Sequence, residues 1–565
     1  MKTKSVTLFL FITIFVAKSV ATTFYVDPTG GNNTKDGLSW SNAVADITTA
    51  ITKANTAPYD VTVEDILVKQ GTMSFAISRG YTSMDNIFGS CAGTESSPAE
   101  RPTVDVDGNG KIEPWEFQYP TIFTSTLAAS NSTATIALTL NLTNATFNGF
   151  TIIHNPNSSS FLSKNIYCSN ATTTFENNII RNCNNTSSWT TGSQLGLILQ
   201  SAGIVKNCLI EKNQVYVTSV MNSSGLSPIM SLTAGAKLLN CVFRNNKVTV
   251  DYSAAVSTNS SASLKGMIVN AESGLVGATT VIANTLVYNN ESVYIPGTGT
   301  LATLTNGATV SLSGTTGAAN TDSIINCTVA NNSTTKMATA GLSAQKVAAK
   351  VNYVLNNTLW NNQNDGVVKN ILVNSTLTSG LVANNVYNGG STGLTVTPTY
   401  VVDNVNDLDN LNTTSIKGAQ FVNPTTFVGV NRVPESLDSI AIAHANWSIN
   451  SNSYLIGKGV TLVGHSLDFI GELFLSSPAV GAYEYVAPIA TSVSDKSTSF
   501  DLGLFTVLGN RIVVGACGYL TVFSIQGAEI KKLKVTAGES IVLNKGCYII
   551  QLTADNGTVS NKIVL

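Results

Sequence analysis

A short sequence motif that recurs along the middle of the chain constrains the fold more than any other feature. One copy reads Asn240-Cys241-Val242-Phe243-Arg244-Asn245-Asn246. Further copies begin at Asn177, Asn207, Asn284, Asn326 and Asn357, and a weaker one begins at Asn384. The leading asparagines follow one another at intervals of 27 to 44 residues. Repeats of this length are typical of solenoids, in which each unit buries its apolar face by stacking on its neighbours.

Each copy has the alternation of a short strand with an asparagine at both ends. The positions that we expect to point inward are Cys208 and Ile210, Cys241 and Phe243, Thr285 and Val287, and Cys327 and Val329. The positions that we expect to point outward are Arg181, Glu211, Arg244 and Tyr288. The inward cysteines are therefore predicted to be small buried thiols, and Glu211 with Arg244 a solvated cross-strand pair.

Strands that stack in parallel need crossovers, and helical crossovers would show a 3.6-residue periodicity. The segments between the copies are instead rich in Ser, Thr, Gly and Asn, with β-branched runs such as Val215 to Thr218. Asparagine suits corners because it tolerates left-handed backbone geometry. Asparagines stacked at the ~4.8 Å strand spacing can also link their side-chain amides into a ladder. The sequence therefore predicts a parallel β-helix.

Composition and the first residues indicate an exported protein. Only 11% of the 565 residues are charged and 43% are apolar, and 31 Lys and Arg nearly balance 33 Asp and Glu. No nucleic-acid partner is expected from such a balance. Residues 1–21 combine a basic start, an apolar run and the small-residue site Ser19-Val20-Ala21, as in a secretory signal peptide. After its removal we expect no transmembrane segment, because no other long apolar run exists.

The N-terminal region resembles a known class of proteins. Phe24 to Asn32 and Asp36 to Trp40, a helix-like stretch at 43–54 and the runs Asp65 to Thr72 and Ile87 to Glu95 follow one another. This order resembles the opening of exported bacterial right-handed β-helix proteins of the pectin-lyase-like class. The resemblance implies an N-terminal cap, which an open solenoid end needs. It implies an all-β chain with a right-handed parallel β-helix over 22–486.

The C-terminal part contains the elements Asp468-Phe469-Ile470-Gly471 and Gly481 to Tyr485 in sequence. Their order resembles the one that closes many exported β-helix proteins, such as those of Bacteroidetes. Residues 487–499 are expected to form a linker. Alternating strands with glycine turns predict a small β-sandwich over 500–565. The sandwich resembles a C-terminal sorting domain, which implies secretion machinery as a partner and a secreted or outer-membrane-surface location. Cys517 and Cys547 could form a disulfide there or remain free.

The clearest chemical motif is a twelve-residue stretch, 105–116, within a charged insertion at 102–119. It matches the EF-hand calcium loop, D-x-[DN]-x-[DN]-G-x₅-E, at every specified position. The expected ligands are side-chain oxygens, together with the backbone carbonyl of Lys111, and they come from Asp105, Asp107, Asn109, Lys111, Glu113 and Glu116. Nearby prolines oppose the flanking helices of a paired EF-hand. As a single unpaired loop, the site is expected to hold calcium as a structural cofactor rather than as a sensor, and the alternative is a surface turn rich in Asp, Asn and Gly.

Catalytic residues are not indicated by the sequence. Glycoside hydrolysis generally needs two carboxyl groups facing one bond, and the carboxylates between 121 and 400 are few and scattered. The histidines His154, His444 and His465 have no evident catalytic partner. We therefore expect a non-catalytic, adhesin-like or glycan-binding protein with a polysaccharide or host glycan as partner. A polysaccharide lyase or glycoside hydrolase is the alternative, and it rests on fold analogy.

Overall fold

The computed structural model describes residues 22–485 and 505–564, with gaps at 57, 60–62, 126–135, 155–163, 190–196, 220–228, 234, 254–265, 273–276, 299–306, 314–319, 345–350, 374–379, 388–390, 393–401, 405–418, 431–436, 509–510, 525–528, 544–546 and 555–556. The expected signal peptide (1–21) and linker (487–499) lie outside the described residues. The chain divides into two compact units between Tyr485 and Val486.

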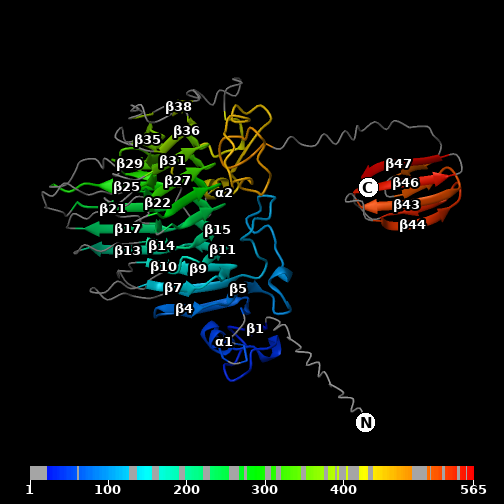
Figure 1. The fold of residues 1–565 in the computed structure, drawn as a ribbon, viewed down its shortest axis with the longest axis horizontal. Coiled ribbons are helices and arrows are strands. Elements are labelled where there is room, and N and C mark those ends of the chain that lie inside the picture. Colours follow the sequence, from blue (N-terminus) through cyan, green and yellow to red (C-terminus); the bar gives the residue numbers. More distant parts are fainter. Residues whose placement is uncertain are drawn as a thin grey trace, which may run out of the picture. The chain divides into compact units, whose positions relative to one another are not determined.

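The first unit is a right-handed parallel β-helix, as predicted, and Figure 1 shows its strands stacked in successive layers. A complete coil contributes one strand to each of four ladders, which we number sheets 1 to 4 in chain order. Sheets 1 and 2 are joined into one 21-stranded parallel sheet. Each strand pairs with its counterpart one coil further along, so the side-chain position is kept from coil to coil.

The strands of sheet 1 are β1 Thr23–Val26, β2 Asp65–Lys69, β5 Asn86–Cys91, β8 Thr146–Asn148, β11 Thr174–Glu176, β15 Ile204–Lys206, β19 Lys237–Leu239, β23 Thr279–Ala283, β27 Thr321–Ile325, β31 Val351–Leu355, β36 Gly380–Tyr387 and β38 Val402–Asn404. Those of sheet 2 are β3 Gly71–Phe75, β6 Thr121–Ser125, β9 Phe150–His154, β12 Ile179–Arg181, β16 Leu209–Glu211, β20 Val242–Arg244, β24 Leu286–Tyr288, β28 Thr328–Ala330 and β32 Thr358–Trp360, which pairs with the end of β36.

Sheet 3 consists of β13 Asn184–Trp189, β17 Gln214–Ser219, β21 Lys247–Asp251, β25 Glu291–Ile295, β29 Ser333–Thr335, β33 Gln363–Asn364 and the antiparallel β34 Val367–Val368. Sheet 4 consists of β4 Arg79–Ser83, β7 Ile136–Leu142, β10 Lys164–Cys168, β14 Leu197–Ser201, β18 Met230–Thr233, β22 Gly266–Glu272, β26 Ala308–Leu312, β30 Leu342–Ala344, β35 Ile371–Val373 and β37 Ser391–Thr392.

The corner between sheets 1 and 2 is an asparagine with left-handed backbone geometry. Its φ lies between 48° and 56° in the successive coils, at Asn177, Asn207, Asn240, Asn284, Asn326, Asn356 and Asn384. The repeat that we began at Asn357 is therefore shifted by one residue, because Asn356 occupies the corner. Asn357 takes the next, inward position, which Cys327 holds one coil earlier.

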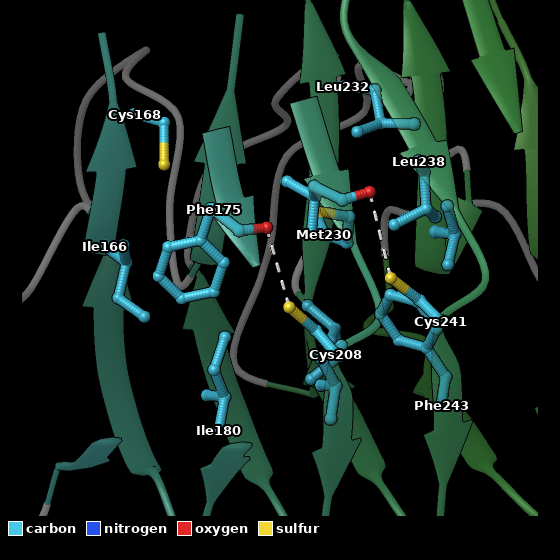
Figure 2. Close-up of a cluster of buried hydrophobic side chains, with 14 of the residues drawn as sticks. Ile166, Cys168, Phe175, Ile180, Cys208, Met230, Leu232, Leu238, Cys241 and Phe243 are labelled. Atoms are coloured by element: carbon cyan, nitrogen blue, oxygen red, sulfur yellow. Dashed lines mark hydrogen bonds between the residues drawn. The ribbon is translucent and has the colours of Figure 1, made fainter. Parts of the chain in front are cut away.

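The inward positions of sheets 1 and 2 form continuous columns. Cys208, Cys241 and Cys327 share one column with Thr285, and all four are fully buried. Figure 2 shows Cys208 and Cys241 side by side in the core, each thiol directed at a backbone carbonyl of the preceding coil. The structure thus confirms the predicted inward face and the buried thiols.

An asparagine ladder runs along the corner between sheets 2 and 3. Each amide Nδ2 donates to the Oδ1 of the next asparagine over 2.8 or 2.9 Å, through Asn213, Asn246, Asn290, Asn332, Asn362 and Asn370. The same side chains accept backbone N–H groups and donate to backbone carbonyls of the adjoining coils. The ladder therefore satisfies corner backbone groups that no strand pairing reaches.

Different structures cover the ends and one outer face of the β-helix. Helix α1 (Ile47–Ala54), shorter than the helix-like stretch expected at 43–54, buries Ile47 and Ile51 against the first coil. It follows a short 3₁₀ turn at Trp40–Asn42. The last described parallel strand is β38. Residues 419–430 and 437–485, which we name the closing segment, instead lie along the outside of sheet 2, so the coils end earlier than the predicted 486.

The closing segment contains β39 Phe421–Asn423, α2 Leu437–Ala443 and β40 Asn446–Ile449. It covers outward apolar side chains of sheet 2, including Leu286 and Trp360, with Trp447 and Tyr483. In Figure 1 it forms the yellow and orange part of the first unit, on the same side of the stack as the loops around residue 110. The outer face of sheet 2 is thus a second apolar interface rather than a solvated surface.

The second unit consists of two antiparallel sheets, in keeping with the predicted small β-sandwich. One sheet has the order β41 Phe505–Leu508, β42 Arg511–Val514, β45 Ser540–Val542, and the other β44 Glu529–Val535, β43 Gly518–Ser524, β46 Cys547–Ala554, β47 Gly557–Val564. Ile512, Leu520 and Ile550 belong to one shared core. Cys517 is an exposed free thiol, and the side chain of Cys547 lies outside the described residues.

The asparagine ladder should contribute measurably to stability. Replacing Asn290 by Ala removes the side-chain acceptor of the buried Asn246 N–H and a donor to the Phe243 carbonyl. We expect the free energy of unfolding from urea denaturation to fall by about 2 to 4 kcal/mol. Asn452 is exposed, so Asn452→Ala is the control and should change stability by less than about 0.5 kcal/mol. Equal effects of the two substitutions would contradict a structural role for the ladder.

Candidate functional site

The insertion at 102–119 leaves the coils as a loop whose two arms pair with each other. Thr103 and Phe117 form an antiparallel bridge, and Gln118 N–H donates to the Pro102 carbonyl. Arg101 fixes the base, because its guanidinium lies 4.4 Å from the Phe117 ring centre and donates to Gly89 and Asn148. The loop is thus held by strand-like arms, in agreement with the expectation that prolines exclude flanking helices.

Within this loop three of the six predicted ligands come together. Carboxylate oxygens of Asp105, Asp107 and Glu116 lie within 4.8 Å of one another. Asn109 sits between them in sequence, and its Nδ2 donates to Glu113 Oε1 over 2.9 Å. The carboxylate of Asp105 accepts backbone N–H groups of Gly108, Asn109 and Gly110, which shapes the turn. Oxygen ligands of this kind are what Ca²⁺ prefers.

The electrostatics of the loop also fit a cation. Glu116 is buried, and burial together with the neighbouring Glu113 raises its pKa to about 8. Burial raises the pKa of Asp107 as well, against the opposing charge of Arg244. Glu113 Oε2 is buried and has no hydrogen-bond partner. Four acidic side chains crowded beside one lysine would be stabilised by a bound divalent cation.

Arg244 joins the loop to the β-helix and to the closing segment. Its guanidinium donates to Glu211 Oε2 at 2.9 Å, to Asp107 Oδ2 at 3.2 Å and to the carbonyl of Ala443, at the end of α2, at 2.9 Å. His444 Nε2 lies 2.7 Å from the Asp107 carbonyl. Three segments distant in sequence therefore meet at one charged group.

The prediction of a solvated Glu211–Arg244 pair is wrong. Glu211 is 4% exposed and Arg244 6% exposed, because the insertion and α2 cover them. Burial alone would raise the pKa of Glu211, but Arg244 and Arg181 hold it below its usual value. The pair is consequently a buried, multiply hydrogen-bonded ion pair.

Two cavities flank the loop on this face. The first, which we name the charged cavity, has a volume of about 650 Å³, and its charged lining residues are Asp107, Glu116, Arg181, Glu211, Lys212 and Arg244. The second, the loop cavity, has a volume of about 380 Å³, and its lining includes Lys111, Glu113, Trp115, Asn207, Asn240 and Tyr483. Trp115 and His444 line both cavities and so form the wall between them.

Few groups of this unit are placed for acid–base catalysis. His154 points into the core, where burial lowers its pKa to about 4. His465 Nε2 lies 2.9 Å from Asn284 Oδ1, and His444 Nε2 lies 2.7 Å from the Asp107 carbonyl in the insertion. Both histidines therefore make structural contacts. Of the described carboxylates between 121 and 400, Glu176 and Glu291 are each in an ion pair with a lysine of an adjoining coil.

Sequence reasoning missed that Trp115, Tyr483 and the Asn207–Asn240 pair share one cavity. The sequence nevertheless contained an indication that the outer face of sheet 2 is covered. The outward positions of sheet 2 include Leu209, Val242 and Leu286, so both faces of these strands are apolar. Strands that are apolar on both faces are buried on both, which indicates a covering segment.

Comparisons with known proteins add a likeness of fold. No protein-family model and no curated protein matches the sequence. Among solved structures, pectate lyase Pel9A has 14% identity and a TM-score of 0.34, covering 83% of this chain and 98% of its own. A tailspike protein, gp49 of Acinetobacter baumannii bacteriophage Fri1, described as a capsular polysaccharide depolymerase, has 9% identity and a TM-score of 0.28, covering 89% and 74%. At these levels of similarity neither structure assigns a role to a residue of this chain.

In the part of the chain that the structure describes, neither helix has the length and hydrophobicity needed to cross a membrane.

Removing Arg244 should be far more costly than removing a surface cation. In Arg244→Met the buried Glu211 loses its nearest counter-ion and keeps only Arg181 at 3.9 Å, so we expect the free energy of unfolding to fall by about 3 to 5 kcal/mol. Lys206→Met is the matched control, because Lys206 pairs with Glu176 at 2.9 Å but is 38% exposed in its side chain. Its cost should not exceed about 1 kcal/mol. Urea denaturation measures both, and similar losses would argue against the buried ion pair.

Proposed function

We propose that this protein is a secreted or surface-exposed, non-catalytic β-helix that binds glycans on the outer face of sheet 2, beside a calcium-stabilised loop. One observation carries the proposal. The leading asparagines of the later coils, Asn284, Asn326, Asn356 and Asn384, donate their amides to carbonyls of the closing segment. Asn207 and Asn240 have no such bond among the described residues and instead line the loop cavity.

Free amides in a concave, partly aromatic site are suited to a hydroxyl-rich ligand. Ligand pockets are typically of a few hundred Å³, apolar in most of their lining and supplied with a few placed polar groups. The loop cavity has these properties. We further propose that residues 1–21 direct export and that the C-terminal sandwich contacts secretion machinery.

Calcium is proposed as the structural cofactor of the loop. Asp105, Asp107, Asn109, Glu113 and Glu116 would supply side-chain oxygens, and Lys111 its carbonyl. Their charge would be balanced by the ion, which would fix the loop that forms one wall of both cavities. A lone extracellular site should bind with a dissociation constant on the order of 10⁻⁴ to 10⁻³ M. At millimolar calcium the added stability is then about 0.4 to 1.4 kcal/mol.

The calcium proposal predicts a specific loss in Glu116→Gln. This change removes a charge from the expected bidentate ligand, so calcium affinity by calorimetry should fall at least about tenfold. Glu529→Gln, at an exposed position of the second unit, is the control and should leave binding unchanged. Equal binding by wild type and Glu116→Gln, or no binding by either at several millimolar calcium, would show that the loop is not a calcium site.

A polysaccharide lyase or glycoside hydrolase remains the second candidate, on one observation. Glu116 and Asp107 both line the charged cavity, and a carboxyl with a pKa near 8 has the property of a general acid. Against this, Asp107 and Glu211 are both bonded to Arg244, and Glu116 accepts three backbone N–H groups. These carboxylates are engaged in holding the loop.

One screen separates the two functions. The purified full-length protein is tested in calcium-containing buffer for binding to a glycan array and for cleavage of neutral and acidic polysaccharides. We expect binding without new reducing ends or unsaturated products. Cleavage products that disappear in Asp107→Asn would establish the enzyme instead, and an array without any bound glycan would refute glycan binding.

A further inference from the structure

The two cavities differ in charge, and the difference indicates which kind of ligand each can take. The charged cavity has carboxylates and three cations in its lining. In the loop cavity, the formal charges of Lys111 and Glu113 cancel, and the remaining polar groups are largely asparagine amides. A neutral ligand enters such a cavity without leaving a charge unpaired.

The amides of Asn207 and Asn240 are placed to act as a pair. They occupy the same corner position in adjoining coils, so their backbones are separated by about one strand spacing, ~4.8 Å. Each side chain offers one acceptor and two donors. Because both residues have the same left-handed backbone, their two amide groups start from equivalent positions in adjoining coils, a spacing that suits adjacent hydroxyl groups.

Another part of the cavity lining is aromatic. Trp115 is 6% exposed and Tyr483 is 7% exposed, and both belong to the apolar interface beneath the closing segment. Phe469 lies edge-on to Tyr483, with ring centres 5.3 Å apart. A lining that combines aromatic side chains with amide groups suits the apolar face and the hydroxyl groups of a sugar ring.

We propose that the loop cavity binds a neutral pyranose unit of a glycan, with Asn207 and Asn240 binding its hydroxyl groups and Trp115 and Tyr483 forming the apolar wall. This inference rests on the proposed glycan-binding function and specifies its site and ligand class. The cavity volume of about 380 Å³ limits the site to a short segment of the glycan chain.

The test uses glycine substitutions, because glycine keeps the left-handed corner while it removes the side chain. The full-length protein and the double variant Asn207→Gly/Asn240→Gly are titrated with neutral gluco-, manno-, galacto- and xylo-oligosaccharides at millimolar calcium. We expect wild type to bind at least one of these series and the double variant to lose affinity about tenfold or more. Melting temperatures of both proteins confirm that the fold is kept.

Lys212→Gly is the matched control. Lys212 also has a left-handed backbone, with φ of 54°, but it lines the charged cavity. This variant should bind neutral oligosaccharides as wild type does. Unchanged neutral binding in the double variant would refute the site. Binding of anionic oligosaccharides alone, weakened by Lys212→Gly, would overturn the inference but leave glycan binding standing. Binding of no glycan at all would instead refute the proposed function.

Discussion

The left-handed asparagine corner is the constraint on which the first unit depends. At this corner the chain turns from sheet 1 to sheet 2 within two residues. Its left-handed backbone conformation is strained for most residues and is tolerated best by glycine and asparagine. Because the same corner recurs in seven coils, successive strands keep one register and one inward face. The second corner adds the amide ladder, which satisfies backbone groups between sheets. Together they let a solenoid with few charged residues bury a continuous core.

Much of this architecture could be predicted because it repeats. The alternation in Asn-Cys-Val-Phe-Arg-Asn-Asn placed Cys241 and Phe243 inside and Arg244 outside, and the structure confirms each placement. The spacing within the insertion also indicated that Asp105, Asp107 and Glu116 would lie close together, as they do, whereas calcium binding stays a prediction. Stacking at a fixed period makes such inferences local, since each coil needs only its neighbours.

The covering of sheet 2 could not be predicted with the same ease. Contacts between Arg244 and Ala443 or between Asp107 and His444 join segments hundreds of residues apart, and no periodicity connects them. The assumption that outward charges are solvated failed at Glu211 for this reason. The one-residue shift at Asn357 has a different origin, because Asn356-Asn357 offers two candidates and only the backbone distinguishes the corner from the inward position.

The position of the candidate site follows from where the covering segments meet. The closing segment covers the corners of the later coils and uses their amides as hydrogen-bond donors, whereas the insertion reaches the same face from the N-terminal coils. Between them, at the coils of Asn207 and Asn240, no described residue of either segment contributes a carbonyl to the corner amide, and the gap is the loop cavity. Arg244, in the lining of the neighbouring charged cavity, joins the insertion at Asp107 to the closing segment at Ala443. The buried guanidinium thus ties together the two covering segments that also line the loop cavity, on a face that is otherwise covered by apolar packing.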